Sequence, residues 1–122
     1  MSAAKAVSSS LSAFVALSWP LAALAGPARC VAPDIGTKRA PRMTPPLEAK
    51  VIGAGRLYFY SAPDARCPIA GLFVVPRDLL VVYSQTQDGW SSVVYFDGES
   101  GDDSGWVRSA RLKTLGTIAP KP

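Results

Sequence analysis

The feature that most constrains this chain is a series of short β-branched and aromatic runs between Val51 and Leu115, each bounded by a turn signal. No apolar periodicity in this region is long enough for a helix, whereas alternation with a period of two is typical of strands. In Arg56 to Tyr60, this alternation places Leu57 and Phe59 on one face and two tyrosines on the other. The pattern predicts an all-β domain whose core begins on this strand.

Further runs of the same kind follow, separated by proline, aspartate and glycine. The predicted strands are Ile69–Val75, Leu79–Tyr83, Trp90–Phe96 and Gly105–Ser109. Pro76-Arg77-Asp78 predicts a turn, and Asp88-Gly89 predicts a hairpin because this pair adopts positive φ at little cost. Five short strands without a helix indicate a small five-stranded β-barrel or a strongly bent sheet over residues 51–115, followed by a flexible tail at 116–122.

Residues 1–25 have the pattern of a secretory signal peptide. Lys5 precedes the apolar run Leu11 to Leu24, and small residues occupy the positions that a signal peptidase reads, so cleavage is expected after Ala25. A retained amino-terminal anchor is the alternative, but the run contains Pro20 and is shorter than the roughly 20 residues that span a bilayer. We therefore expect a periplasmic or secreted protein without membrane contact after cleavage.

Residues 26–50 form a proline-rich, basic arm. The arm contains five prolines and no aromatic residue, which favours an extended, polyproline-like or disordered chain. It carries five basic and two acidic residues, whereas residues 51–115 carry six basic and seven acidic ones. Most of the chain's net charge of +4 is therefore located in the arm and not in the domain. The nearly neutral domain lacks the basic stripe that nucleic-acid binding requires, so no nucleic-acid partner is expected.

The two cysteines, Cys30 and Cys67, lie in the arm and just after the first strand. An even number of cysteines in an exported chain favours a disulfide, which would make the arm a loop fixed at both ends. Such a bridge is worth roughly 4 kcal/mol in the chain-entropy model. Two free thiols are the alternative, and Arg29 before Cys30 disfavours a lipidated cysteine. The chain has no histidine, so two cysteines cannot complete a zinc site, and no metal or cofactor is expected.

Four short motifs occur in order along the domain. They are Tyr60-Ser61-Ala62-Pro63, Arg77-Asp78, Gly89-Trp90-Ser91-Ser92-Val93, and Gly105-Trp106-Val107 followed by Leu112. Together they resemble the bacterial SH3-like domain of exported proteins. The resemblance implies an SH3-like barrel over residues 51–115. It also implies that eight apolar residues share one core: Leu57, Phe59, Leu72, Leu80, Val82, Val93, Val107 and Leu112.

One strand breaks the alternation on which this core depends. Trp90 lies three residues before Val93, which is out of step with a period of two. We expect a bulge or a turn residue near Ser91-Ser92.

The resemblance also indicates what the domain binds. Eukaryotic relatives bind proline-rich peptides with a Pro and a Tyr on the closing turn, whereas this chain has Arg108 and Arg111 there, so proline-helix recognition is not supported. Guanidinium groups suit carboxylates, which favours peptidoglycan with its acid-bearing stem peptides, or an envelope protein. The candidate ligand-binding residues are Tyr58, Tyr60, Trp90, Trp106, Arg108 and Arg111. Alternatively, both arginines are ordinary surface residues and both tryptophans cap the barrel.

Neither metal binding nor catalysis is favoured by the remaining polar residues. The loop Asp97–Ser104 contains four carboxylates, but their spacing does not match the helix-loop-helix calcium motif, which favours a solvated hairpin loop. Without histidine, a serine or cysteine nucleophile lacks its usual base, and acids on one flexible loop do not face each other across a cleft. The sequence therefore predicts a binding protein rather than an enzyme.

An apolar stripe is predicted on the outside of the domain. Leu79, Val81 and Tyr83 lie opposite the core residues of their strand, and Val94 and Phe96 extend the stripe on the next one. The stripe is a candidate surface for a partner or for self-association, unless the arm folds over it or its facing is inverted. This surface, with the acidic loop, supports the alternative function: a periplasmic inhibitor or immunity protein that blocks a toxin or a cell-wall hydrolase.

Overall fold

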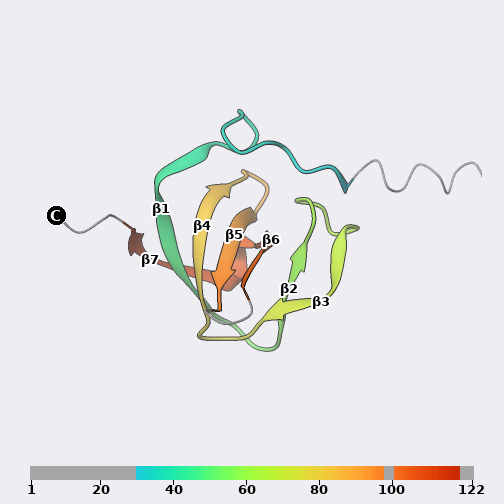
Figure 1. The fold of residues 1–122 in the computed structure, drawn as a ribbon, viewed down its shortest axis with the longest axis vertical. Coiled ribbons are helices and arrows are strands. Elements are labelled where there is room, and N and C mark those ends of the chain that lie inside the picture. Colours follow the sequence, from blue (N-terminus) through green and yellow to red (C-terminus); the bar gives the residue numbers. More distant parts are fainter. Residues whose placement is uncertain (1–29, 98–100, 119–122) are drawn as a thin grey trace, which may run out of the picture.

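The structure is a computed structural model that describes residues 30–97 and 101–118. The predicted signal peptide, the centre of the acidic loop and the end of the tail lie outside these residues. Seven strands form one antiparallel sheet in the order β3-β2-β6-β5-β4-β1-β7 (Figure 1). The strands are β1 (Arg42–Val51), β2 (Leu57–Tyr60), β3 (Pro68–Val74), β4 (Leu79–Gln85), β5 (Trp90–Phe96), β6 (Asp102–Arg108) and β7 (Leu112–Thr117), with a 3-10 turn at Ser109–Arg111.

The all-β prediction is confirmed, but the strands number seven rather than five, and the sheet is not closed. One additional strand, β1, begins in the segment predicted to be an extended arm. It lies between β4 and β7, where Ala49 pairs with both Leu80 and Thr114. The register shifts between Arg42 and Leu47, the stretch that contains two prolines without an N–H to donate. The high proline content therefore did not prevent the second half of this segment from pairing.

Two other predicted boundaries also move. β6 begins at Asp102, within the predicted acidic loop, because Asp102 pairs with Phe96 of β5. β7 continues to Thr117, into the predicted tail, because Gly116 and Thr117 pair with β1. Pairing with a neighbouring strand thus extends β6 beyond the residues that alternation identifies, and it creates β7, a strand that the sequence did not predict.

The hydrophobic core confirms the eight apolar residues predicted to converge. Phe59 and Val107 are fully buried, and Leu72 and Leu112 pack at the edge. The other predicted members are Leu57, Leu80, Val82 and Val93, all buried. The structure adds Ala49 and Val51 from β1, together with Val74.

A glycine allows the β2–β3 hairpin to meet the rest of the sheet. The ladder between β2 and β6 has a single register pair, Tyr60 with Trp106, and Gly105 precedes Trp106. A Cβ atom at Gly105 would lie 3.0 Å from the carbonyl oxygen of Tyr60 and 3.1 Å from the Phe59 ring. The Gly-Trp motif therefore has a steric reason: only glycine lets the two strands approach this closely.

The expected irregularity near Ser92 is a bulge on the neighbouring strand. Val82 of β4 pairs with Val93, and Ser84 pairs with Ser92, so Tyr83 is the extra residue. Along β5 itself the alternation is regular, so Trp90 and Val93 point to opposite faces. Trp90 belongs to a second, smaller apolar cluster on the other side of the sheet.

Candidate functional site

The second cluster, which we call the aromatic cluster, consists of Tyr60, Trp90 and Trp106 from three strands. The rings of Tyr60 and Trp90 meet edge to face, with centroids 4.9 Å apart. Strand pairing places Trp106 in the same cluster, because Trp106 pairs with Tyr60 of β2 and with Ser92 of β5. Both indole rings are nearly inaccessible, with only 3% and 4% of Trp90 and Trp106 exposed. Three of the predicted ligand-binding residues therefore lie together, but both tryptophans are covered and Tyr60 is half-buried.

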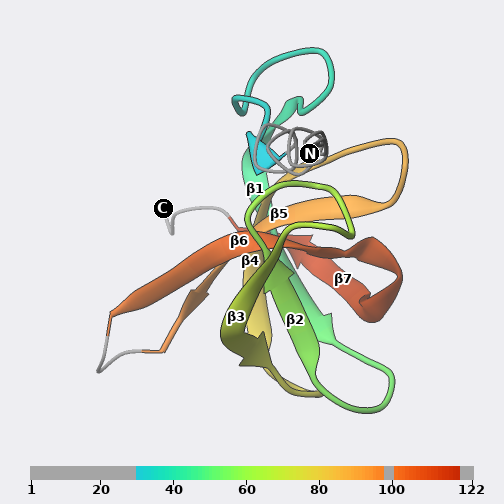
Figure 2. The ribbon, with the colours of Figure 1, turned by 90° about the vertical axis from the view of Figure 1, so that its right-hand side faces the viewer.

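The cover is the chain's own arm. Residues 30–40, which we call the strap, cross one end of β4, β5 and β6 between the β2–β3 hairpin and β1 (Figures 1 and 2). Ala40 is fully buried against the two tryptophans, and the half-buried Ala32 and Ile35 pack on the same cluster. An extended, polyproline-like or disordered arm was expected here, or a loop fixed at both ends if the disulfide formed, and the strap is such a loop, packed on the cluster.

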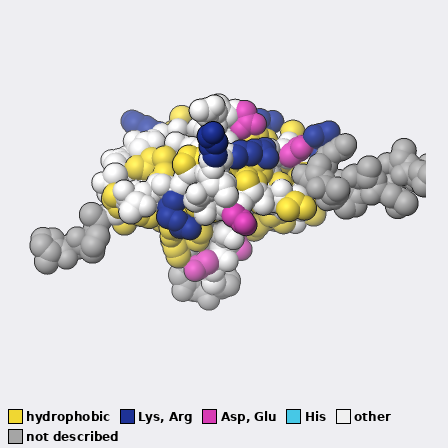
Figure 3. Space-filling model, turned by 90° about the horizontal axis from the view of Figure 1, so that it is seen from above, with side chains coloured by type: hydrophobic (Ala, Val, Ile, Leu, Met, Phe, Trp, Pro, Cys, Tyr) yellow, Lys and Arg dark blue, Asp and Glu magenta, His cyan; other side chains and the backbone are white. Residues whose placement is uncertain are grey.

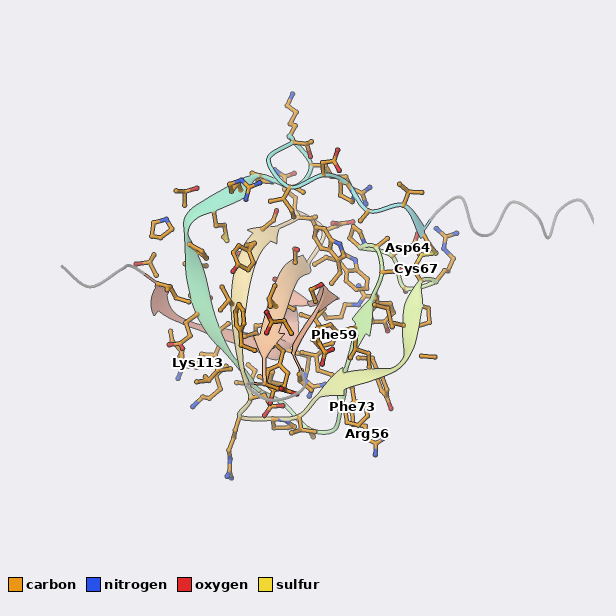
Figure 4. All side chains as sticks on the ribbon, in the orientation of Figure 1. Arg56, Phe59, Asp64, Cys67, Phe73 and Lys113 are labelled. Carbon is orange, nitrogen blue, oxygen red and sulfur yellow. A yellow bond between two sulfur atoms is a disulfide. The ribbon has the colours of Figure 1, made fainter. Side chains whose placement is uncertain are left out.

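The predicted Cys30–Cys67 disulfide is confirmed, and it fixes the start of the strap. Cys67 is buried in the loop between β2 and β3, and Figure 4 shows it beside the first residues of the strap. The other end of the strap continues into β1. A disulfide is typical of an oxidising, exported environment.

A turn within the strap directs two basic side chains outward. The N–H of Gly36 donates to the carbonyl oxygen of Ala40 at 2.7 Å, and the N–H of Ala40 donates to the Thr37 hydroxyl at 3.4 Å. Lys38 and Arg39, at the tip of this turn, are exposed. The space-filling view from the strap side shows basic side chains among apolar ones on this face (Figure 3).

A cavity of about 420 Å³ separates the strap turn from the β4–β5 hairpin. Its lining residues are Lys38, Arg39, Thr86, Gln87 and Asp88. The hydroxyl group of Thr86 donates to the Asp88 carboxylate at 2.5 Å and also accepts the N–H of Trp90 at 3.2 Å. These bonds hold the hairpin loop, and Asp88 with it, in a defined position.

Arg108 flanks the same hairpin. It pairs with Trp90 across the β5–β6 ladder, and its guanidinium carbon lies 4.1 Å from the centre of the Trp90 ring. Neither Arg108 nor Lys38 nor Arg39 forms an ion pair with a carboxylate among residues 30–97 and 101–118. We call these three side chains the cationic rim.

Tyr58 and Arg111, the other predicted ligand-binding residues, lie away from the aromatic cluster. Arg111 donates to the carbonyl oxygens of Ile52 at 2.6 Å and Gly55 at 2.7 Å, so it holds the turn between β1 and β2. Tyr58 packs on Phe73 of β3, with ring centroids 5.8 Å apart. Arg56 covers the Phe73 ring at 4.2 Å, and Figure 4 shows this pair at the opposite end of the hairpin from Cys67.

The acidic segment has an electrostatic effect on a neighbouring tyrosine. Asp78 raises the pKa of Tyr95 above its usual range, and burial, Asp97 and Asp103 add to this effect. Negative charges oppose formation of the phenolate anion. Within the described chain, no group of three or more acidic or cysteine ligands is arranged to hold a metal ion. The described residues also include no helix long and apolar enough to span a membrane.

The predicted outer stripe has the expected facing. Leu80 and Val82 are buried, whereas 47% of Leu79 and 52% of Phe96 are exposed. Val81, Tyr83 and Val94 are half-buried, and Val81 pairs with Val94. The described strap packs on the aromatic cluster, which lies on the same face of β5 as Val94 and Phe96, and none of its packing contacts involves a residue of the stripe.

Sequence reasoning missed the strap residues that complete the site. Ala32, Ile35 and Ala40 are small or isolated apolar residues among prolines and charges, so no periodicity marks them as buried. The available signal was the cysteine pair, which brings the arm to the β2–β3 loop. Comparison with models of known protein families, with curated proteins and with solved structures finds no match for this chain.

Proposed function

We propose that this protein is an exported, non-catalytic SH3-like binding module of the cell envelope, whose ligand is peptidoglycan or an envelope protein that presents carboxylates. The four motifs that resemble the family support this proposal, because three of them contribute to one cluster next to the cationic rim. Tyr60, Trp90 and Trp106 come from separate motifs and form the aromatic cluster.

The observation that carries the proposal is the cationic rim. Lys38, Arg39 and Arg108 surround the β4–β5 hairpin from two segments far apart in sequence, without ion pairs to described residues. Trp90 holds the guanidinium group of Arg108 in place, so less side-chain freedom is lost when a ligand binds. Exposed guanidinium and ammonium groups without local partners suit the carboxylates of stem peptides.

Sedimentation with insoluble peptidoglycan tests this function on the purified exported protein. We expect retention at low salt that falls as salt rises, because exposed charges are screened. Arg108→Ala should weaken retention several-fold. Arg56→Ala is the matched control, because it removes an exposed arginine that also stacks on an aromatic ring, on the β2–β3 hairpin. Equal retention of all three proteins, or equal loss in both variants, would show that the cationic rim is not the binding surface.

A second candidate function, inhibition of a toxin or a cell-wall hydrolase, is favoured by one observation. The outer stripe exposes two large apolar side chains, Leu79 and Phe96, on adjacent strands. Apolar side chains gathered on one exposed face are typical of a protein-protein contact surface.

A further inference from the structure

The strap is attached to the domain differently from the strands. Among the described residues, the hydrogen bonds of residues 31–40 stay within residues 34–42. For example, the Thr37 hydroxyl donates to the Asp34 carbonyl oxygen at 2.8 Å, and the Arg42 guanidinium donates to the Ile35 carbonyl oxygen at 3.4 Å. The strap therefore folds on itself and does not add to the sheet.

Two things hold the strap on the aromatic cluster. The first is apolar contact through Ala32, Ile35 and Ala40, of which only Ile35 has a large side chain. The second is the Cys30–Cys67 disulfide, which joins the start of the strap to the β2–β3 loop. Such a tether keeps the local concentration of the strap high, so that weak contacts are enough to keep it in place.

The main core does not depend on these contacts. It lies on the opposite side of the sheet from Trp90, and neither cysteine nor any residue of the strap belongs to it. The strand pairs of the sheet likewise include no residue of the strap.

We propose that the strap is a redox-controlled cover of the aromatic cluster: reduction of the Cys30–Cys67 disulfide releases residues 30–40 and exposes Trp90 and Trp106. The oxidised protein presents the complete cationic rim and keeps the cluster covered. In the reduced protein Lys38 and Arg39 move away with the strap, and the cluster forms an apolar surface beside Arg108.

The chemistry of release needs a dithiol reductant. Its thiolate attacks the sulfur of Cys30, which is half-buried, whereas Cys67 is only 3% exposed. The disulfide bond breaks, the Cys67 sulfur leaves as a thiolate and takes up a proton, and a mixed disulfide forms at Cys30. The second thiol of the reductant then displaces Cys30, so two electrons and two protons pass to the protein and the reductant becomes a disulfide.

Tryptophan fluorescence reports on this step directly. The chain contains three tryptophans, and Trp19 lies in the predicted signal peptide, so the exported protein has only the two beneath the strap. On addition of a dithiol we expect emission to move to longer wavelength and quenching by acrylamide to increase. Far-ultraviolet circular dichroism should stay unchanged. A Cys30→Ser/Cys67→Ala variant should resemble the reduced protein and show no response to the dithiol.

A second variant separates the cover from the disulfide. Ile35→Asp keeps both cysteines but places a charge against the cluster, so it should increase quenching in the oxidised protein. Val31→Asp is the matched control, because Val31 is 75% exposed. Unchanged fluorescence on reduction, or loss of the circular dichroism signal with it, would overturn the proposal, because the strap must open while the sheet stays folded.

The consequence for ligand binding rests on the proposed function and is measured separately. Sedimentation with peptidoglycan, with and without the dithiol, should show a change in retention if the cluster adds to the binding surface. A fluorescence change without altered retention supports the cover and counts against the cluster as part of the ligand site. Fluorescence therefore tests the redox-controlled cover, and retention tests the proposed ligand binding, so that either proposal can be overturned without the other.

Discussion

Individual residues with similar chemistry have different environments in this protein. Arg108 stacks on Trp90 at the aromatic cluster, whereas Arg111, three residues later, binds two backbone carbonyl groups of the β1–β2 turn. Gly53 lies directly against Arg111, where a Cβ atom would be 2.5 Å from its Nε atom. Arg111 therefore holds a turn in place, and of these two arginines only Arg108 belongs to the cationic rim.

Arg77 is a residue in a conformation that suits glycine better. Its φ is 84°, and it follows Pro76 in a turn closed by the N–H of Asp78 donating to the Val75 carbonyl oxygen at 3.1 Å. Proline followed by a residue with positive φ is the arrangement of a type II turn. The predicted turn at Pro76-Arg77-Asp78 is confirmed.

Replacing this arginine should stabilise the protein. Positive φ costs a residue with a Cβ atom roughly 1–2 kcal/mol, and the greater freedom of glycine in the unfolded chain offsets part of the gain. We expect Arg77→Gly to raise the free energy of unfolding by roughly 1 kcal/mol in urea denaturation. Arg77→Ala, which keeps a Cβ atom, should produce no such gain, and an equal gain in both variants would rule out this explanation.

At the scale of elements, the β5–β6 ladder joins the two apolar clusters. Its register pairs Ser92 with Trp106 and Ser91 with Val107, so adjacent residues of one strand face different clusters. At the far end of the ladder, Tyr95 pairs with Asp103, and Asp78 and Asp97 also act on its phenol group. The same pairing that builds the sheet therefore places a tyrosine among carboxylates.

The raised pKa of Tyr95 makes stability depend on pH in alkaline solution. The folded protein holds the phenol proton more tightly than the unfolded chain, whose tyrosine pKa is about 10. This contribution is complete below the unfolded pKa and is lost as pH rises through the folded one. We expect the free energy of unfolding to fall less between about pH 9 and pH 11 in Tyr95→Phe than in the wild type. Parallel curves would contradict the expectation.

The whole molecule has two surfaces of different character, both on the face of the sheet that is turned away from the main core. One carries the strap, the aromatic cluster and the cationic rim. The other is the outer stripe, where Leu79 and Phe96 are exposed and no described segment covers them. The proposed recognition of a charged ligand concerns the first surface, and the alternative, protein-protein contact, concerns the second.

Sedimentation equilibrium tests the second surface. If the stripe mediates self-association, the wild type should form dimers as its concentration rises, and Phe96→Lys should remain monomeric because lysine resists burial. Val31→Lys, at an exposed apolar position on the strap, should associate like the wild type. A monomeric wild type at every concentration would exclude self-association and leave a different protein as the partner of the stripe.

Predictions from the sequence succeeded where the signal is local. Alternation in Leu57 and Phe59, and again in Leu80 and Val82, identified the core face correctly because side chains in a strand alternate between faces. The cysteine pair was predicted correctly from an even number of cysteines together with the expectation of export. Alternation depends only on residues that are neighbours in sequence, and the disulfide depends only on the tendency of cysteines to pair in an oxidising environment.

The remainder depends on residues that are distant in sequence. Proline content marked the arm as extended, but the ladder with β4 and β7 made its second half a strand. The aromatic residues of the candidate site were identified from sequence, but not that Ala40 and Ile35 cover them, because small apolar residues between prolines form no pattern. Arg108 and Arg111 were indistinguishable until their contacts were known.

The sequence by itself therefore determined the all-β class, the inward faces of the strands and the disulfide, since alternation and cysteine chemistry act locally. Only the tertiary structure decided that seven strands share one open sheet and that the strap covers the aromatic cluster. The physical reason is that strand pairing and burial are settled by whichever segments meet in space. A weakly apolar arm becomes ordered because a covalent bond brings it to an aromatic surface.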